Sequence, residues 1–258
     1  MDITGVLEEW PYEPDEITVR KIIGDDGREK VQMRLDLGLL QMEGMGRPDG
    51  ERPFGYESLL EYYEDKKQNY QYRYGTTEGF RLCGDECVEL RNEALQYYYR
   101  YLSLFHLEDY EGVIRDTSRN LRVFDLIREY AVNEEDRLAL ERYRPYVLMM
   151  NARARANLAL GRNKPVESLG IIEEALDRIR TFLCDHDREE YFEESGEVLF
   201  LRQLAEQIKE QIPRDPRDDL RRRMQEAVQE EDYELAAELR DRIRELEGRV
   251  PSQSEKNP

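Results

Sequence analysis

The stretch Asp218–Gly248, DDLRRRMQEAVQEEDYELAAELRDRIRELEG, decides how the end of the chain folds. Its apolar residues recur at three- and four-residue spacing, which is the spacing of one face of an α-helix. They form two stripes, the first of Leu220, Met224, Ala227 and Val228 and the second of Ala236, Leu239, Ile243 and Leu246. The acidic turn Glu230-Glu231-Asp232 separates the stripes, and Asp232 is a good N-cap for the second helix. The sequence therefore predicts an antiparallel helical hairpin, in which Ala236 and Ala237 let the two backbones approach closely.

This stretch closely resembles the UVR motif, also called the UvrB/UvrC motif. That helical hairpin is shared by bacterial excision-repair subunits, Clp-type ATPases and activators of protein-arginine kinases. The positions that carry the family's residue types are Leu220, Met224, Ala227, Glu231, Asp232, Tyr233, Glu234, Ala236, Ala237, Leu239, Arg240, Asp241, Ile243 and Leu246. In the family the hairpin binds protein, often another UVR hairpin or a coiled coil, and is not catalytic. The resemblance implies a protein-binding site, with Glu231, Asp232, Tyr233, Arg240 and Asp241 as contact residues beside the apolar stripes.

The remainder of the chain departs from the named members of that group. It has no Walker A lysine, which excludes a helicase subunit or a Clp ATPase, and it lacks the four CxxC pairs of the kinase activators. A strand hairpin followed by helices and a terminal UVR hairpin is similar to other bacterial proteins that carry the UVR motif.

The charge of the chain limits its partners. With 258 residues there is room for one or two domains, and 39 basic against 58 acidic residues leave a net charge of −19. Such a surface repels phosphate, so direct binding to nucleic acid or to an anionic membrane is disfavoured. Even the hairpin region Arg214–Arg249 has nine arginines against twelve acidic residues. The 17 tyrosines, 7 phenylalanines and many aliphatic residues indicate a folded protein, because disordered chains lack this apolar mass.

The sequence favours a cytoplasmic protein. Residues Met1–Trp10 are acidic and lack the basic and apolar regions of a signal peptide, and no window approaches 18 apolar residues. The three cysteines are too few for a disulfide framework, so we expect reduced thiols.

Residues 16–42 predict a β-hairpin at the N-terminus. Val31, Met33, Leu35, Leu37 and Leu39 alternate with polar residues or glycine, as in one half-buried strand. A preceding strand contains Ile17, Val19 and Ile23, and Gly24-Asp25-Asp26-Gly27 supplies the turn. Two strands bury too little apolar surface alone, so the row must lie against helices of the same chain or against a second copy. The following glycine- and proline-rich stretch, Gly44–Gly55, lacks both GxxxxGK[ST] and GxGxxG and is better explained as a connector than as a phosphate-binding loop.

Helical spacing prevails from Tyr56 to Ile212. The predicted helices cover Glu86–Phe105, Glu111–Tyr130, Asn133–Leu160, Pro165–Cys184 and Glu193–Gln211. In the first helix Val88, Leu95 and Leu102 recur every seven residues and mark the predicted core stripe. The tyrosines at 97, 98, 99 and 101 are expected to pack in the core, since base stacking requires a basic groove that this acidic chain does not offer.

The stretch Asn151–Leu176, NARARANLALGRNKPVESLGIIEEAL, resembles a degenerate tetratricopeptide repeat. A helix rich in small residues leads to a turn at Gly161, and Ser168, Ile172, Ala175 and Leu176 follow at that family's second-helix offsets. A weaker copy near Val113 lies 55 residues upstream of Ser168, whereas true arrays repeat at about 34 residues. The resemblance implies an α-helical-hairpin bundle of tetratricopeptide-like style, without establishing a continuous peptide-binding superhelix.

Candidate catalytic and metal-binding residues are few. Cys83 and Cys87 form a C-x3-C pair at a helix start, where a low thiolate pKa is physically reasonable, but zinc would need two further ligands. The histidines are His106 and His186, the latter close to Cys184 in the sequence. Catalysis by a Cys/His pair needs an orienting partner as well. We therefore predict no catalytic residue, no metal site and no cofactor.

The predicted fold class is mainly α with a small β part (α+β). Residues 1–55 form the β-hairpin and connector, 56–212 the helical domain, 213–248 the UVR hairpin and 249–258 a disordered tail. The favoured hypothesis is a non-enzymatic adaptor whose UVR hairpin docks on a bacterial ATPase, kinase or excision-repair subunit in stress response, proteolysis or repair. Self-association as a homodimer is a companion hypothesis. The alternative is an enzyme of unknown class that the UVR motif recruits, with a site near the connector and the tyrosine-rich helix that contains Arg47, Arg52, Tyr56 and Cys83.

Overall fold

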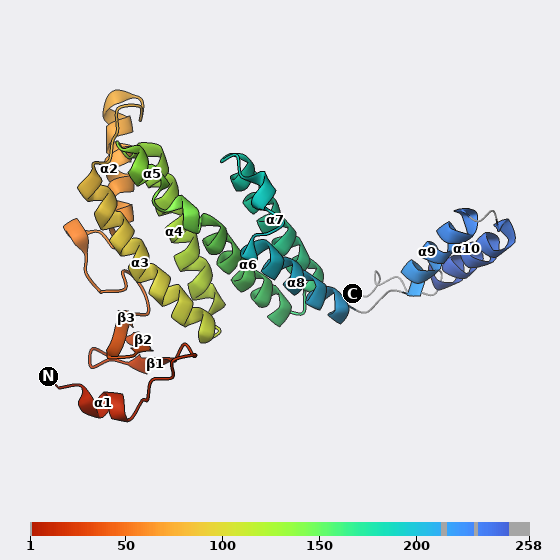
Figure 1. The fold of residues 1–258 in the computed structure, drawn as a ribbon, viewed down its shortest axis with the longest axis horizontal. Coiled ribbons are helices and arrows are strands. Elements are labelled where there is room, and N and C mark those ends of the chain that lie inside the picture. The colour runs from red at the N-terminus through yellow and green to blue at the C-terminus, as the bar shows by residue number, and fades with distance from the viewer. Residues whose placement is uncertain (1, 213–215, 230–231, 248–258) are drawn as a thin grey trace, which may run out of the picture. The chain divides into compact units, whose positions relative to one another are not determined.

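The computed structural model describes residues 2–212, 216–229 and 232–247. The chain divides into two compact units, of which the first ends at Ile208 and the second begins at Lys209. The first unit holds a small antiparallel sheet and most of the helices, and the second holds a helical pair (Figure 1). The prediction of a mainly α chain with a small β part is confirmed. The predicted domain boundaries stay predictions, and the tail 249–258 lies outside the described residues.

A three-stranded antiparallel sheet takes the place of the predicted two-stranded hairpin. Its strands are β1 (Val19–Ile23), β2 (Glu29–Leu35) and β3 (Gly38–Glu43), in the order β1-β2-β3. The expected turn at Gly24–Gly27 joins β1 to β2, and Gly27 has a φ of +74°, which glycine adopts without strain.

The single strand predicted across Val31–Leu39 is wrong, because the chain reverses at Asp36 and Leu37. Leu37 is 89% exposed, and Leu39 pairs with Arg34, so Leu39 lies on the opposite face from Met33. The Arg34 guanidinium closes this turn, because its Nη1 donates to the carbonyls of Asp36 (3.2 Å) and Gly38 (2.9 Å). Asp36 and Gly38 occupy polar positions of the alternation, which hides the turn in the sequence.

The apolar face of the sheet lies against helices of the same chain. Val31, Met33 and Met42 join the hydrophobic core. Lys21 of β1 donates to Asp109 (Nζ–Oδ2 2.7 Å) between α3 (Gly84–His106) and α4 (Tyr110–Tyr130). The sequence left open whether helices of the same chain or a second copy cover this face, and the structure shows helices of the same chain.

The other helices of the first unit are α1 (Thr4–Glu8), α2 (Leu59–Tyr74), α5 (Glu134–Leu138), α6 (Arg144–Gly161), α7 (Pro165–Cys184) and α8 (Gly196–Gln211), with short 3-10 turns at Pro53–Gly55, Glu141–Tyr143 and Glu189–Tyr191. The single helix predicted over Asn133–Leu160 is wrong: this stretch contains α5, a 3-10 turn and α6. Pro145 sits in the first turn of α6, where a missing backbone N–H is tolerated, whereas in a continuous helix its ring would clash with the preceding turn.

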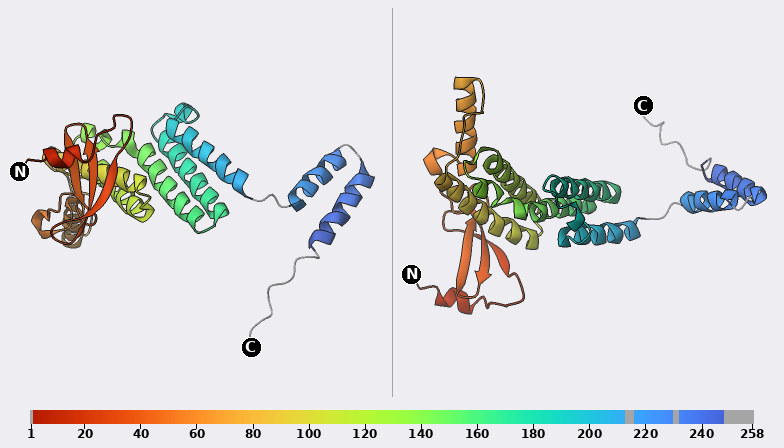
Figure 2. Two further views of the ribbon diagram at one scale, coloured as in Figure 1. Left: turned by 90° about the horizontal axis from the view of Figure 1, so that it is seen from below. Right: turned by 45° about the horizontal axis from the view of Figure 1, so that its top comes forward.

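The helices pack as antiparallel pairs in a layered stack. α3 packs on α4, α4 on α6 and α6 on α7 (Figures 1 and 2). Buried alanines on α6 allow α7 to approach, and Ser168 of α7 donates from Oγ to the carbonyl of Ala156 at 3.1 Å. Ile172 and Ala175 are buried on the same helix, and Leu176 is half-buried. The resemblance to tetratricopeptide repeats stays a prediction.

The core face of α3 differs from the predicted stripe. Val88 is 42% and Leu95 49% exposed. The buried positions are Cys87, Leu90, Glu93, Ala94, Tyr97, Arg100, Tyr101, Ser103 and Leu104. Leu102, the third residue of the predicted stripe, is half-buried and packs against the core, so the seven-residue repeat lies at the edge of the buried face. That face also includes the charged residues Glu93 and Arg100. Of the clustered tyrosines, Tyr97 and Tyr101 are buried, and Tyr98 and Tyr99 are half-buried and pack against the core, so the expected core packing is confirmed.

The second unit is an antiparallel pair of helices, α9 (Pro216–Gln229) and α10 (Tyr233–Glu247). The Asp232 carboxylate accepts from the backbone N–H of Leu235 at 3.1 Å, which confirms the predicted N-cap. Nowhere in the described chain is a helix both long and apolar enough to cross a membrane.

Candidate functional site

The inner face of the α9–α10 hairpin is built from the predicted apolar stripes. Ala227 of α9 is 2% exposed, and it faces an interior that Ala236, Leu239 and Ile243 of α10 complete at 7–9% exposed. Leu220, Met224, Ala237 and Leu246 are half-buried. These side chains cover one another, so most of each stripe holds the hairpin together rather than facing a partner.

The apolar surface that stays open lies at the turn end of the hairpin. Val228, next to the last residue of α9, is 50% exposed, and Tyr233, the first residue of α10, is 67% exposed. Leu235 is 37% exposed and was missed by the sequence interpretation. A signal for it exists, because Leu235, Leu239, Ile243 and Leu246 follow 4-4-3 spacing and extend the second stripe by one turn.

Charged side chains surround these apolar residues. Asp232, Arg240 and Asp241 are exposed, and Arg240 donates from Nε to Asp241 Oδ1 at 3.0 Å. On α9, Arg222 and Glu226 form an exposed ion pair at 2.9 Å. Exposed pairs of this kind add little to stability, so little stability is lost if they are broken when another protein docks. The predicted contact residue Glu231 falls outside the part of the chain that the structure describes.

Comparison with known proteins identifies this hairpin. Residues 217–249 match the family model of the UvrB/uvrC motif, UVR. The matched UVR segment coincides with α9 and α10 and includes none of the first unit. The UVR motif is a non-catalytic interaction motif and indicates a protein-interaction or repair-associated role. The chain has no match among the curated proteins, and none among the solved structures.

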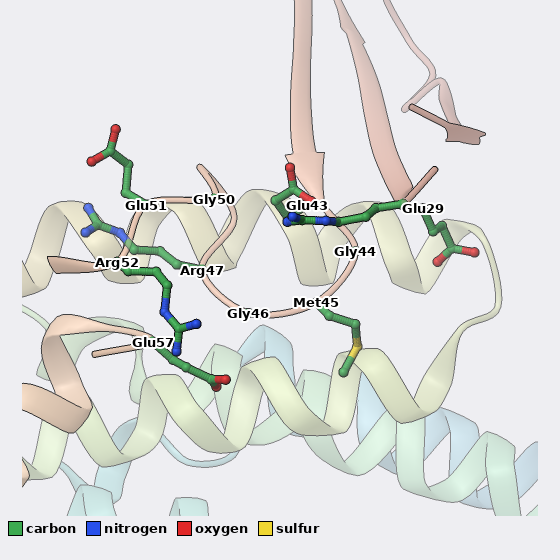
Figure 3. Close-up of a pocket in the computed structure, with 11 residues that line it drawn as sticks. Glu29, Glu43, Gly44, Met45, Gly46, Arg47, Gly50, Glu51, Arg52 and Glu57 are labelled. Carbon is green, nitrogen blue, oxygen red and sulfur yellow. The ribbon is translucent and has the colours of Figure 1, made fainter. Parts of the chain in front are cut away.

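The connector forms a second candidate site outside the UVR motif. A cavity of about 360 Å³ is lined by connector residues and by the ends of β2 and β3 (Figure 3). Arg47 and Arg52 line it, but Tyr56 and Cys83 do not. The Tyr56 hydroxyl instead donates to Asp65 at 2.8 Å. The four residues of the enzymatic alternative are therefore not brought together at this cavity.

Several polar groups of the connector are held by contacts with the helices. Arg100 of α3 donates from Nη1 to the carbonyls of Glu43 (2.9 Å) and Gly46 (2.7 Å), and Arg115 of α4 donates to that of Gly44 (3.2 Å). Arg47 pairs with the buried Glu93 (Nε–Oε2 3.3 Å). The cavity lining contains four glutamates, Glu29, Glu43, Glu51 and Glu57, against three arginines, Arg28, Arg47 and Arg52, so its charge does not favour phosphate. These contacts support the interpretation of Gly44–Gly55 as a structural connector.

In the described part of the chain, the cysteines and histidines do not gather into a metal-binding group. Cys87 is fully buried, and burial raises its pKa to about 11, contrary to the lowered thiolate pKa considered for this pair. Cys83 is exposed and caps α3, with its backbone N–H donating to Glu86 at 2.8 Å. His186 Nδ1 lies 2.7 Å from the carbonyl of Phe182. Among the described residues, no group of three metal-binding side chains occurs.

Proposed function

We propose that this chain is a non-enzymatic adaptor whose UVR hairpin docks on a partner protein. The match of residues 217–249 to the UVR motif is the observation that carries the proposal. The partner classes are those associated with the motif: a bacterial ATPase, kinase or excision-repair subunit in stress response, proteolysis or repair. The proposal places this docking in the cytoplasm, in keeping with three cysteines that form no disulfide.

The turn end of the hairpin is the proposed contact surface. Tyr233 supplies a large exposed ring with a polar tip, a residue type that protein interfaces favour, and Val228 and Leu235 add apolar area beside it. Asp232, Arg240 and Asp241 then select the partner by paired charges. Ala227, Ala236, Leu239 and Ile243 act indirectly, because they hold the two helices together.

A protein is a better partner for this surface than nucleic acid. The region Arg214–Arg249 has a net charge of −3 from nine arginines and twelve acidic residues. Binding to DNA or RNA would require a surface that attracts phosphate and releases counterions. The same hairpin surface on a second copy is a further partner within this proposal, and light scattering that shows a monomer at high concentration would contradict it.

The test compares crosslinked pull-downs from the native cell with four forms of the chain. These are the full chain, a deletion of residues 214–258, Tyr233→Ala, and Tyr72→Ala as the matched control, since Tyr72 is an equally helical tyrosine that is 93% exposed on α2. We expect particular proteins to be lost with both the deletion and Tyr233→Ala and kept with Tyr72→Ala. Recovery of the same proteins by all four forms would disprove the proposal.

A further inference from the structure

An aromatic cavity opens between helices of the first unit. It has a volume of about 790 Å³ and is lined by residues of α3, α4, α5, the 3-10 turn Glu141–Tyr143, α6 and α8. Tyr101 and Phe124 are buried at 1% and 4% exposed, whereas Tyr98 of α3 and Tyr146 of α6 are half-buried with ring centroids 6.3 Å apart. Leu95, at 49% exposed, also lines the cavity. The cavity therefore offers an accessible apolar lining to a side chain from outside.

A guanidinium lies further along the same helices. Arg153 of α6 sits between two rings, with its Cζ 4.3 Å from the centroid of Phe105 on α3 and 4.1 Å from that of Phe200 on α8. Its hydrogen bond within the described chain is a weak one, from Nη1 to the sulfur of Met150 at 3.5 Å. Across all described residues, no carboxylate pairs with Arg153, although the chain has 58 acidic residues.

The lack of a carboxylate partner for Arg153 is unfavourable, because Arg153 is a half-buried cation. Burial lowers the pKa of Arg153, because the charged form loses water that the two rings replace only in part. Arg144, on the same helix, shows the usual arrangement, since it pairs with Glu141 (2.7 Å) and Asp125 (3.0 Å). A carboxylate brought to Arg153 from outside would gain two parallel charge-assisted hydrogen bonds in a site that the rings shield from water.

The cavity and Arg153 are close enough for one ligand to reach both. Tyr146 lines the cavity and lies near enough to Arg153 to interact with it electrostatically. The two residues are seven positions apart on α6, which is roughly 10 Å along a helix axis. An extended peptide covers that distance in about three residues.

We propose that this face of α3, α6 and α8 binds an extended acidic segment of a partner protein, with an apolar side chain in the tyrosine-lined cavity and a carboxylate on Arg153. A polypeptide fits better than a small anion, because the tyrosine-lined cavity and Arg153 are separate and a small anion cannot occupy both at once. It also fits better than nucleic acid, because a strand carries a phosphate at every nucleotide and would meet Glu135 and Glu197 at the cavity end, whereas the proposed segment places an apolar side chain there and its carboxylate on Arg153. This surface belongs to the first unit, so it is independent of docking through the UVR hairpin.

The proposal is tested by selecting a displayed random peptide library on the full chain, on Arg153→Gln and on Arg155→Gln. Arg155 is the matched control, because it is another half-buried arginine of the same helix and already pairs with Glu174 at 3.0 Å. We expect peptides with Asp or Glu about three residues from an aromatic or aliphatic residue to be enriched by the unmodified chain and by Arg155→Gln, but not by Arg153→Gln.

Affinities of one enriched peptide then measure the carboxylate contact. Replacement of its acid by the amide is expected to weaken binding about tenfold to the unmodified chain, and to have no effect on binding to Arg153→Gln. Equal thermal unfolding of the three chains shows that each is folded. The proposal fails if no acidic sequence is enriched, if Arg153→Gln enriches the same peptides, or if a single-stranded oligonucleotide binds in competition with the peptide.

Discussion

The guanidinium of Arg100 donates two hydrogen bonds to the carboxylate of Asp116, with Nε–Oδ2 at 2.7 Å and Nη2–Oδ1 at 2.8 Å. Both side chains are buried, at 1% and 0% exposed, so the pair joins α3 to α4 without contact with water. The remaining nitrogen of the same guanidinium holds the connector through the carbonyls of Glu43 and Gly46. One arginine therefore fixes two helices and the segment that follows the sheet.

We expect Asp116→Asn to destabilise the first unit strongly. The change keeps the shape of the side chain but leaves Arg100 buried without a counter-charge, which costs about 3–5 kcal/mol in comparable buried pairs. Urea unfolding should show this loss of stability. In the unmodified chain the backbone N–H of Glu43 donates to the carbonyl of Pro48 at 2.8 Å, and its hydrogen exchange should become faster in the variant. Glu193→Gln is the control, because its pair with Arg202 is exposed and is expected to contribute little to stability.

A second prediction concerns stability at acid pH. Burial alone would raise the pKa of Asp109, but hydrogen bonds from Lys21 and from the backbone N–H of Gly112 outweigh it and lower the pKa below its usual value. A depressed carboxylate pKa stabilises the folded state above the unfolded-state pKa of about 3.9, and this contribution is lost as the pH falls through the folded-state value.

Asp109→Asn keeps a cap for α4 but removes the titrating group and the ion pair to β1. We therefore expect it to lower the stability at pH 6 and to flatten the pH dependence of unfolding below about pH 4. Glu167→Gln removes an exposed i,i+3 pair with Lys164 and provides the comparison. An Asp109→Asn chain whose stability falls with acid as steeply as that of the unmodified chain would contradict this role.

The sequence predicts the parts of the fold that depend on local spacing and on helix ends. The bounds of α7 were predicted without error, because Pro165 begins the helix and its apolar residues keep one period up to Cys184. The two stripes of the UVR hairpin were predicted for the same reason. In contrast, the apolar and polar residues of Val31–Leu39 alternate without a break in the sequence, although the chain turns at Asp36 and Leu37. The single strand predicted there is therefore two strands, β2 and β3.

Features that depend on contacts between distant segments were not predictable in this way. Glu93 and Arg100 lie on the core face of α3 because their partners come from other segments, among them Arg47 and Asp116. The setting of Arg153 likewise depends on Phe105 and Phe200, which come from helices far apart in the sequence. For the UVR hairpin, the apolar spacing predicted which residues form the stripes. It did not predict which of them lie in the interior and which stay exposed at the turn end.

A third prediction uses the thiols as probes of burial. Cys83 and Cys184 are exposed, whereas Cys87 is fully buried and its pKa is raised to about 11. Desolvation and the neighbouring Glu189 also raise the pKa of Cys184, so its labelling should be slower than its exposure alone would allow. At pH 8 a raised pKa leaves less of the reactive thiolate, and burial also excludes the reagent. We expect iodoacetamide to label Cys83 and Cys184 in the native chain and Cys87 only after unfolding, as followed by peptide mass spectrometry. Labelling of Cys87 at the rate of Cys83 would show that the start of α3 opens readily.

The last prediction separates the stability of the UVR hairpin from that of the first unit. Leu239 is 7% exposed and fills the small interior between α9 and α10. Leu239→Ala should lower the free energy of unfolding of the hairpin by about 2–5 kcal/mol, which is a large loss because the hairpin has a small core. Hydrogen exchange is expected to become fast throughout α10 and to stay unchanged in α4 and α6, because the two units are separately compact.

Leu235→Ala, on the same helix, is the matched control, since Leu235 is 37% exposed and its loss should change the exchange of α10 only slightly. The two variants also distinguish the two roles of apolar residues in the hairpin. Leu239→Ala should weaken partner binding by unfolding the hairpin, whereas Leu235→Ala should weaken it with the hairpin intact. Faster exchange in α6 on Leu239→Ala would mean that the first unit depends on the hairpin for its stability, and the separation argued above would be wrong.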